Sequence, residues 1–350
     1  MSLWADKYKP KSLDQLSYHK DLSKHLKKLA HSENIPHMLF YGPSGAGKKT
    51  RIIAVLREIY GAGVDKLKVE QRQFVSTSNR KLLFTVVSSN YHIEVSTGDL
   101  GIYDRYIMQD VIKSIAQSQQ IDANARHSFK MVIIDQADEL TKEAQAALRR
   151  TMEKYATNMR LILCCNNLSR IIAPVRSRCM LIRVARPETN EIVRVLQEVA
   201  STEKFTLPTE LARNIAEHAD RNMRASLLSL ESTAARYPDL TTVKQPDDMD
   251  WQIAISRIAD NIMKEQSAPK LLEIRKQLVD VYTKCIQSSV ILKKLSFDLI
   301  ERVPEPIKIK IVEQAAFHEH RLRIGNKDIF HLEAFVAHVM SIYKNYLNNK

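Results

Sequence analysis

Three glycines and two lysines are gathered in one short stretch of this 350-residue chain. After an apolar segment the stretch reads Gly42, Pro43, Ser44, Gly45, Ala46, Gly47, Lys48, Lys49, Thr50. Glycines allow successive backbone N–H groups to converge on phosphate oxygens, and a helix that begins after them adds positive potential. A lysine directly after the last glycine reaches the β- and γ-phosphates of a nucleotide. The stretch therefore predicts a phosphate-binding loop with Lys48 as its cation.

The residue after Lys48 departs from the usual pattern of such loops. A serine or threonine hydroxyl normally binds Mg²⁺ there, whereas this chain has Lys49, whose ammonium would repel a metal ion. Thr50 follows one residue too late to replace the hydroxyl. We therefore expect the loop to bind ATP or ADP, and Mg²⁺ at this site is doubtful.

A second strand, predicted over residues 130–135, ends at Asp135 and is followed by Gln136. In nucleotide hydrolases such an aspartate holds the metal ion, and the next residue is a glutamate that acts as a base toward water. Gln136 is an amide and cannot act as that base. Hydrolysis is therefore not expected, and the alternative is an active ATPase in which Thr50 and another carboxylate, such as Asp138, rescue the site.

No metal site is predicted elsewhere in the chain. His318 and His320 are two residues apart, so on a helix they point to different faces. The four cysteines have no zinc-binding spacing and are typical of buried thiols in a reducing compartment.

The order of the apolar segments predicts an α/β domain over residues 1–185. Strands at 36–41, 130–135 and 160–165 alternate with helices, which is typical of a parallel sheet covered on both faces. Strand-like runs at 82–87 and 91–95 predict a hairpin insertion at about 72–96.

The rest of the chain is predicted to be helical. Residues 186–240 contain three helices, and 241–250 form a linker rich in Pro, Thr and Asp. Residues 251–350 form a third domain of helices.

Charge divides unevenly between these regions. The net charge of the chain is +13, and residues 1–185, with 29 Lys and Arg against 17 Asp and Glu, carry +12 of it. Such an excess indicates a polyanionic partner, although charge kept for solubility is an alternative. No apolar run approaches the length of a membrane span, and we expect a soluble protein that is not secreted.

Several further segments resemble the small subunits of replication factor C, the eukaryotic AAA+ loader of the sliding clamp. The resemblance covers essentially the whole chain and rests on the segments Leu3–Pro10, Ala147–Glu153, Ser177–Cys179, Gly325–Lys327 and His331–Phe335. The Lys49 substitution, the hairpin and the missing base look like the member at the end of the subunit spiral, whose own ATPase site is degenerate.

The resemblance implies a fold and several residue roles. The fold would be an α/β AAA+ P-loop domain with a parallel sheet, a small helical lid domain and an all-α C-terminal collar domain for oligomerisation. Ala5 and Ser17 would line the adenine pocket, and Asn166 and Arg224 would be the two sensor residues. Arg178 would be an arginine finger that acts in trans on the nucleotide of a neighbouring subunit.

The resemblance also implies partners, namely the other clamp-loader subunits, the sliding clamp and primer-template DNA in the nucleus. Arg105 is the best candidate for DNA binding. Arg80 and Lys81 are further candidates, although charges at a hairpin tip are more often simply solvated. The function expected is loading of the clamp with little hydrolysis by this chain. The alternatives are a catalytically active AAA+ ATPase subunit of a DNA-repair or checkpoint remodelling complex, and a scaffold that binds no nucleotide.

Overall fold

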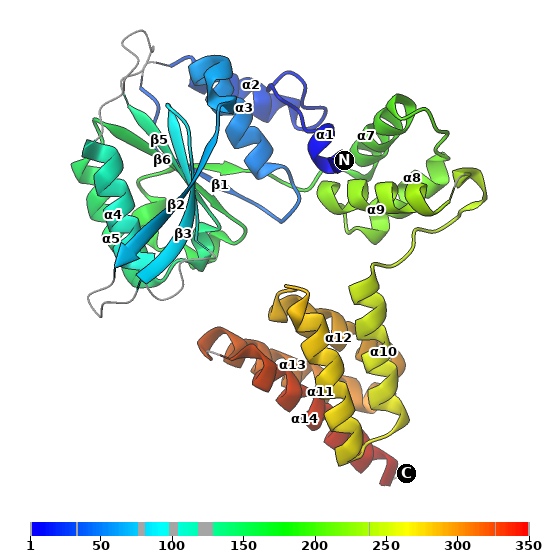
Figure 1. Ribbon diagram of the computed structural model, residues 1–350. Coiled ribbons are helices and arrows are strands. Elements are labelled where there is room, and N and C mark those ends of the chain that lie inside the picture. The colour runs from blue at the N-terminus through cyan, green and yellow to red at the C-terminus, as the bar shows by residue number, and fades with distance from the viewer. Residues whose placement is uncertain are drawn as a thin grey trace. The chain divides into compact units, whose positions relative to one another are not determined.

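The computed structural model describes residues 2–32, 34–75, 81–97, 104–117, 129–237, 239–325 and 327–348. The chain folds as two compact units, Met1–Pro246 and Asp247–Lys350 (Figure 1). The division falls within the predicted linker, between a short 3₁₀ helix, Leu240–Thr242, and the helix that begins at Asp250.

Within the described residues, a seven-stranded sheet forms the centre of the first unit, in the order β2-β3-β4-β5-β6-β1-β7. Its strands are β1 (Met38–Tyr41), β2 (Lys68–Val75), β3 (Lys81–Ser88), β4 (His92–Ser96), β5 (Lys130–Asp135), β6 (Met159–Cys165) and β7 (Met180–Arg183). The five strands from β4 to β7 in this order are mutually parallel, while β2, β3 and β4 pair in antiparallel fashion. The predicted parallel sheet is therefore present, with an antiparallel extension at one edge.

The expected hairpin differs from the sequence prediction in its relation to this sheet. β3 and β4 pair as a hairpin, with Val86 opposite Val95. However, β4 also pairs in parallel with β5, so it is a strand of the central sheet and not part of an insertion. The reason is that Ile93 and Val95 are buried in the sheet core, and burial of apolar side chains fixes the position of the strand.

Helices cover both faces of the sheet (Figure 1). The helices of this part of the chain are α2 (Lys20–Ala30), α3 (Lys48–Tyr60), α4 (Asp104–Gln117), α5 (Lys142–Lys154) and the short α6 (Ala173–Arg176). Buried side chains of α2 and α3 pack on one face, around Phe40, and those of α4 and α5 pack on the other, around Leu39. Because neighbouring strand residues point to opposite faces, β1 contributes to both cores.

The three helices predicted after the sheet form a small bundle in the same unit: α7 (Thr189–Thr202), α8 (Thr209–His218) and α9 (Met223–Arg236). The N-terminal helix α1 (Trp4–Lys7) packs against α9, and the Trp4 ring stacks on Phe205 with centroids 5.6 Å apart. The N-terminal segment therefore packs against the three-helix bundle α7–α9, which is called the lid bundle below.

The second unit is entirely helical over its described residues: α10 (Asp250–Lys264), α11 (Ala268–Thr283), α12 (Ser288–Arg302), α13 (Glu305–Ile324) and α14 (Asp328–Asn348). Its core includes the fully buried Phe335 of α14. No helix among the described residues is long and apolar enough to cross a membrane.

The phosphate loop also touches the lid bundle. Gly45 has a φ of +72°, and a Cβ placed on it would lie 1.6 Å from Oδ1 of Asn222. That oxygen caps α9 by accepting a hydrogen bond from the N–H of Ala225 at 3.1 Å. A side chain at position 45 would therefore collide with the cap.

We predict that Gly45→Ala destabilises the protein by more than the backbone cost alone. An alanine at the positive φ of Gly45 costs about 1–2 kcal/mol. Displacement of the Asn222 cap should cost about 1 kcal/mol more. Urea unfolding of Gly45→Ala, Asn222→Ala and the double variant measures the difference, since Gly45→Ala should cost less once the Asn222 side chain is removed. Equal costs of Gly45→Ala with and without Asn222 would contradict the contact.

Candidate nucleotide-binding site

The Lys48 side chain lies within the phosphate loop. Its Nζ donates hydrogen bonds to the carbonyl oxygens of Gly42 (2.7 Å) and Pro43 (2.9 Å) and to Oδ1 of Asn166 (2.8 Å). Burial lowers the pKa of this ammonium, since removal from water disfavours the charged form. All three acceptors are neutral, so an anionic phosphate oxygen would be a stronger partner for Lys48.

The loop glycines lie where a side chain would collide with the protein. A Cβ on Gly42 would lie 2.0 Å from the carbonyl oxygen of Val184, and one on Gly47 would lie 2.3 Å from the hydroxyl of Tyr18. Both glycines have positive φ, as does Gly45. The loop therefore keeps this conformation only with glycine at these positions.

Lys49 points to two carboxylates. Its Nζ forms an ion pair with Glu94 of β4 and lies 3.7 Å from Oδ2 of Asp135 at the end of β5. Burial lowers the pKa of Lys49, but the hydrogen bond to Glu94 and the charges of both carboxylates outweigh this effect and raise it. Lys49 is thus a fixed cation beside the aspartate that would otherwise hold a metal.

Gln136 follows Asp135 in a left-handed conformation, with a φ of 55°. Its N–H donates to Oδ1 of Asp135 at 3.0 Å, and its carbonyl accepts from the hydroxyl of Thr97 at 2.7 Å. Both oxygens of Asp135 therefore have a partner, one the Gln136 N–H and the other the Lys49 ammonium.

Asp138 contacts the backbone that follows β6. Its Oδ2 accepts hydrogen bonds from the N–H groups of Asn166 (3.3 Å) and Asn167 (3.2 Å), while its buried Oδ1 has no hydrogen-bond partner. Asp138 is not among the residues that line the cavity described next. Its carboxylate thus positions the Asn166 backbone, which gives no support to the rescued metal site considered from the sequence.

A cavity of about 490 Å³ lies between the phosphate loop, the N-terminal segment and the lid helices. Cofactor pockets typically occupy about 300–1,000 Å³. Of the residues singled out from the sequence, the cavity is lined by Ala5, Ser17, Ser44, Gly45, Gly47, Lys48, Lys49, Thr50, Asp135, Gln136, Asn166 and Arg224. Gly42, Pro43 and Ala46 do not line it; the first two hold Lys48, and the Ala46 carbonyl accepts the Tyr18 hydroxyl at 3.1 Å.

The lid side of the cavity was missed by sequence reasoning. Val195, Glu198, Val199 and Leu227 line it from α7 and α9. Their helical spacing also fits ordinary packing of a bundle, so it carried no signal of a ligand. Cys164 and Cys165 also line the cavity. The sequence could have predicted this, because they are the last two residues of β6 and directly precede Asn166.

Positive charge dominates the lining. The cations are Lys9, Lys48, Lys49 and Arg224, against the carboxylates of Asp135 and Glu198. Burial lowers the pKa of Lys9, and the nearby charge of Lys49 lowers it further. A polyanion such as a nucleotide phosphate chain would relieve this repulsion, so the residues fit a nucleotide.

The same residues do not fit Mg²⁺. The ion requires oxygen ligands at about 2.0–2.1 Å in near-octahedral geometry. Lys49 occupies the loop position whose hydroxyl normally binds the metal, and its ammonium lies 3.7 Å from Oδ2 of Asp135. Among the described residues, no group of three or more His, Cys, Asp or Glu side chains is arranged to hold a metal ion.

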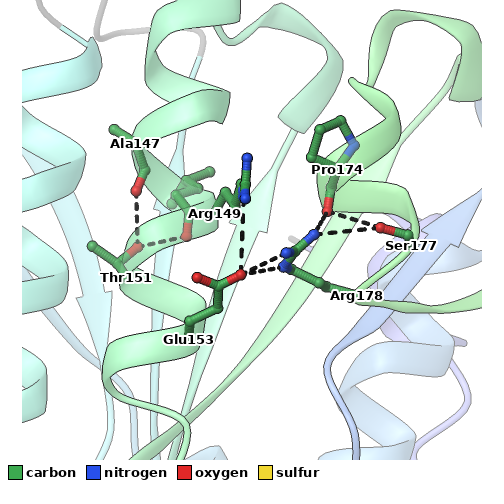
Figure 2. A network of polar contacts seen from close by, with 8 residues as sticks. Ala147, Arg149, Thr151, Glu153, Pro174, Ser177 and Arg178 are labelled. Atoms are coloured by element: carbon green, nitrogen blue, oxygen red, sulfur yellow. Dashed lines mark hydrogen bonds and ion pairs between the residues drawn. The ribbon is translucent and has the colours of Figure 1, made fainter.

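Arg178 lies outside this cavity, after α6, in a network with α5 (Figure 2). Its Nε and Nη2 contact Oε1 of Glu153 at 2.7 and 2.6 Å, and its Nη1 donates to the carbonyl of Pro174 at 2.8 Å. Arg149, one helical turn before Glu153, lies 3.9 Å from the same oxygen. About a third of the Arg178 side chain (31%) is exposed.

Of the three candidate DNA-binding residues, only Arg105 has a side chain that the structure describes. Arg105 lies in the first turn of α4, is 47% exposed and forms a 3.7 Å ion pair with Glu143. Lys81 begins β3, and its side chain lies outside the described part of the structure, as does the whole of Arg80.

Three family models match parts of the chain. One described as "Replication factor C subunit 3, C-terminal domain" matches residues 251–347, and one described as "RCF1/5-like, AAA+ ATPase lid domain" matches residues 194–235. A third, described as "DNA polymerase III, delta subunit", matches residues 18–188. A solved variant of Thermotoga maritima RuvB has a similar fold, with a TM-score of 0.50 and 15% identity over 77% of this chain and 85% of that one.

Full-length relatives are much more similar in sequence. A Neurospora crassa protein named replication factor C subunit 5 is 49% identical over 347 residues, which cover 99% of each chain. The human protein named replication factor C subunit 3 is 43% identical over 349 residues, which cover 100% of this chain and 98% of the human one. With its AAA+ fold, lid and C-terminal helical domain, this chain therefore belongs to the replication factor C subunits, the AAA+ clamp-loader family of DNA replication.

Proposed function

We propose that this chain is a subunit of a hetero-oligomeric clamp loader and binds ATP or ADP with little or no hydrolysis of its own. In the assembly it supplies Arg178 to the nucleotide site of a neighbouring subunit. The assembly loads the sliding clamp onto primer-template DNA in the nucleus. The full-length identity to replication factor C subunits supports the assembly and its task.

The observation that carries the proposal is the pairing of Lys49 with Glu94 and Asp135. Phosphoryl transfer depends on a metal ion that neutralises charge and on a group that orients the attacking water. Here a lysine ammonium lies beside the metal-binding aspartate, and Gln136 stands where the base belongs. The cavity keeps its phosphate-binding cations, so binding is retained while the machinery of hydrolysis is not.

The position of Arg178 supports its action on another subunit. Its guanidinium is partly exposed and does not line this chain's own cavity. A guanidinium supplied across an interface stabilises charge on the transferred phosphoryl group and is worth about 10³–10⁵ in rate. Arg178 is therefore available to a nucleotide that another chain holds.

DNA contact is proposed through the basic first unit. The excess of +12 in residues 1–185 and the exposed Arg105 in the first turn of α4 support binding to phosphate groups. Such contacts hold the duplex without reading its sequence. This suits a loader, which must act at any primer end.

Nucleotide binding is predicted to depend on Lys48 and not on Mg²⁺. Lys48→Ala should weaken ADP and ATP binding at least about tenfold, since a hydrogen bond to a charged group contributes about 1.5–3 kcal/mol. Chelation of Mg²⁺ with EDTA should change the affinity of the unmutated chain little. Equilibrium dialysis with and without EDTA measures both effects.

Two further variants control this experiment. Lys24→Ala removes an exposed lysine of α2 and should bind nucleotide normally. Lys49→Thr removes the internal cation and restores the hydroxyl, so its binding should become sensitive to Mg²⁺. Loss of binding by the unmutated chain on chelation alone would count against the proposal.

Gln136→Glu is predicted not to restore ATP hydrolysis. A restored base has little to act on while Lys49 still pairs with Asp135, because no metal then activates the phosphate. Steady-state release of phosphate by the purified variant, compared with the unmutated chain, measures the effect. Rapid Mg²⁺-dependent turnover by this single variant would show that Lys49 does not block hydrolysis. The same turnover by the unmutated chain would favour the alternative of an active ATPase subunit.

Arg178→Ala is predicted to lower ATP hydrolysis by the assembled complex and to leave nucleotide binding by the isolated chain unchanged. The nucleotide site of one neighbouring subunit loses its guanidinium. The total rate of ATP hydrolysis should therefore fall by the fraction that this site contributes. Arg178→Lys should rescue poorly, because an ammonium lacks the planar fork. The measurement is the ATPase activity of the complex reconstituted with clamp and primer-template DNA.

Arg183→Ala, at an exposed arginine of β7, is the matched control and should leave turnover unchanged. If the Arg178→Ala complex hydrolyses ATP at the unmutated rate, Arg178 has no role in trans.

A further inference from the structure

Arg178 makes several polar contacts, although about a third of its side chain is exposed. Nη1 donates to the carbonyl of Pro174 and lies 3.5 Å from the Ser177 hydroxyl, while Nε and Nη2 share Oε1 of Glu153 (Figure 2). One N–H of Nη2 is left for an acceptor outside this network, since a guanidinium has five N–H groups.

The backbone around Arg178 is also fixed. Val175 and Cys179 are buried in the core of the sheet, and the Arg178 N–H donates to the carbonyl of Val175 at 3.1 Å. The Arg178 side chain is therefore anchored at its base by the main chain, and its guanidinium is held by Glu153. Such an anchor limits the guanidinium to a narrow range of positions.

Stability gives a weak reason for the Glu153 contact. Half of the Glu153 side chain (51%) and a third of that of Arg178 (31%) are exposed. Exposed ion pairs contribute only about 0–1 kcal/mol to stability. Orientation is a stronger reason for this contact. An arginine side chain has about 2 kcal/mol of rotamer entropy to lose when it binds a ligand, and a side chain that Glu153 already holds in place loses less of it on binding.

The charges of the network leave the finger attractive to an anion. The Glu153 carboxylate contacts both Arg149 and Arg178, so two cations share one anion. The cluster therefore keeps one net positive charge. Glu153 can hold the guanidinium without cancelling the field that a phosphate would experience.

We propose that Glu153 is a positioning residue for Arg178: its carboxylate fixes the orientation of the guanidinium, whose remaining N–H can contact a phosphate of the neighbouring subunit. This inference rests on the proposed trans role of Arg178. Glu153 itself touches no nucleotide and acts only through the arginine.

The test is a double-mutant cycle in the reconstituted complex with clamp and DNA. Glu153→Ala should lower turnover at the dependent site about tenfold, within the roughly 100-fold that a 1 Å misplacement can cost. The KM for ATP should change little, since the finger acts in the transition state. Glu153→Gln should retain most of the activity, because its amide oxygen can still accept from Nε.

Combination with Arg178→Ala distinguishes positioning from general damage. Glu153→Ala added to Arg178→Ala should lower turnover no further than Arg178→Ala alone. Asp21→Ala, at an exposed carboxylate of α2, controls for loss of surface charge and should match the unmutated complex.

The outcomes separate the two proposals. If Arg178→Ala lowers turnover but Glu153→Ala does not, the positioning role is wrong and the finger remains. If the double variant is clearly slower than Arg178→Ala, Glu153 acts by another route and the inference is also overturned. If Arg178→Ala has no effect, the proposed function itself fails.

Discussion

The site depends on four adjacent parallel strands whose carboxyl ends meet at one edge of the sheet. β4, β5, β6 and β1 are neighbours in that order. Segments far apart in the chain thereby bring the phosphate loop, Asp135 and Asn166 to one cavity. This convergence explains why Lys48 can donate to Asn166, 118 residues later in the chain.

The same convergence decides the electrostatics of the site. Lys49 is the second residue of α3, and its side chain meets both Glu94 of β4 and Asp135 at the end of β5. This places an internal cation beside two carboxylates. The other cations that line the cavity, Lys9, Lys48 and Arg224, remain available to a phosphate chain.

Arg178 belongs to a different surface of the same unit. Buried Val175 and Cys179 fix the turn that carries it, and Glu153 of α5 holds its guanidinium. Both α5 and the turn pack on the face of the sheet that holds α4. Under the proposed function, the nucleotide site and the trans-acting arginine therefore lie in separate parts of one unit.

The phosphate-loop motif, Lys49 and Gln136 in place of the usual metal ligand and base, the strand at Lys130–Asp135 and the alternation of strands and helices could be read from the sequence, because each depends on local residue types and spacing. Packing of distant segments set the features that local spacing does not encode. It placed β4 within the sheet, because Ile93 and Val95 needed an apolar core, and it paired Lys49 with Glu94 across two strands. It also assembled the lid side of the cavity and joined Arg178 to Glu153, since such contacts arise only when distant segments pack together.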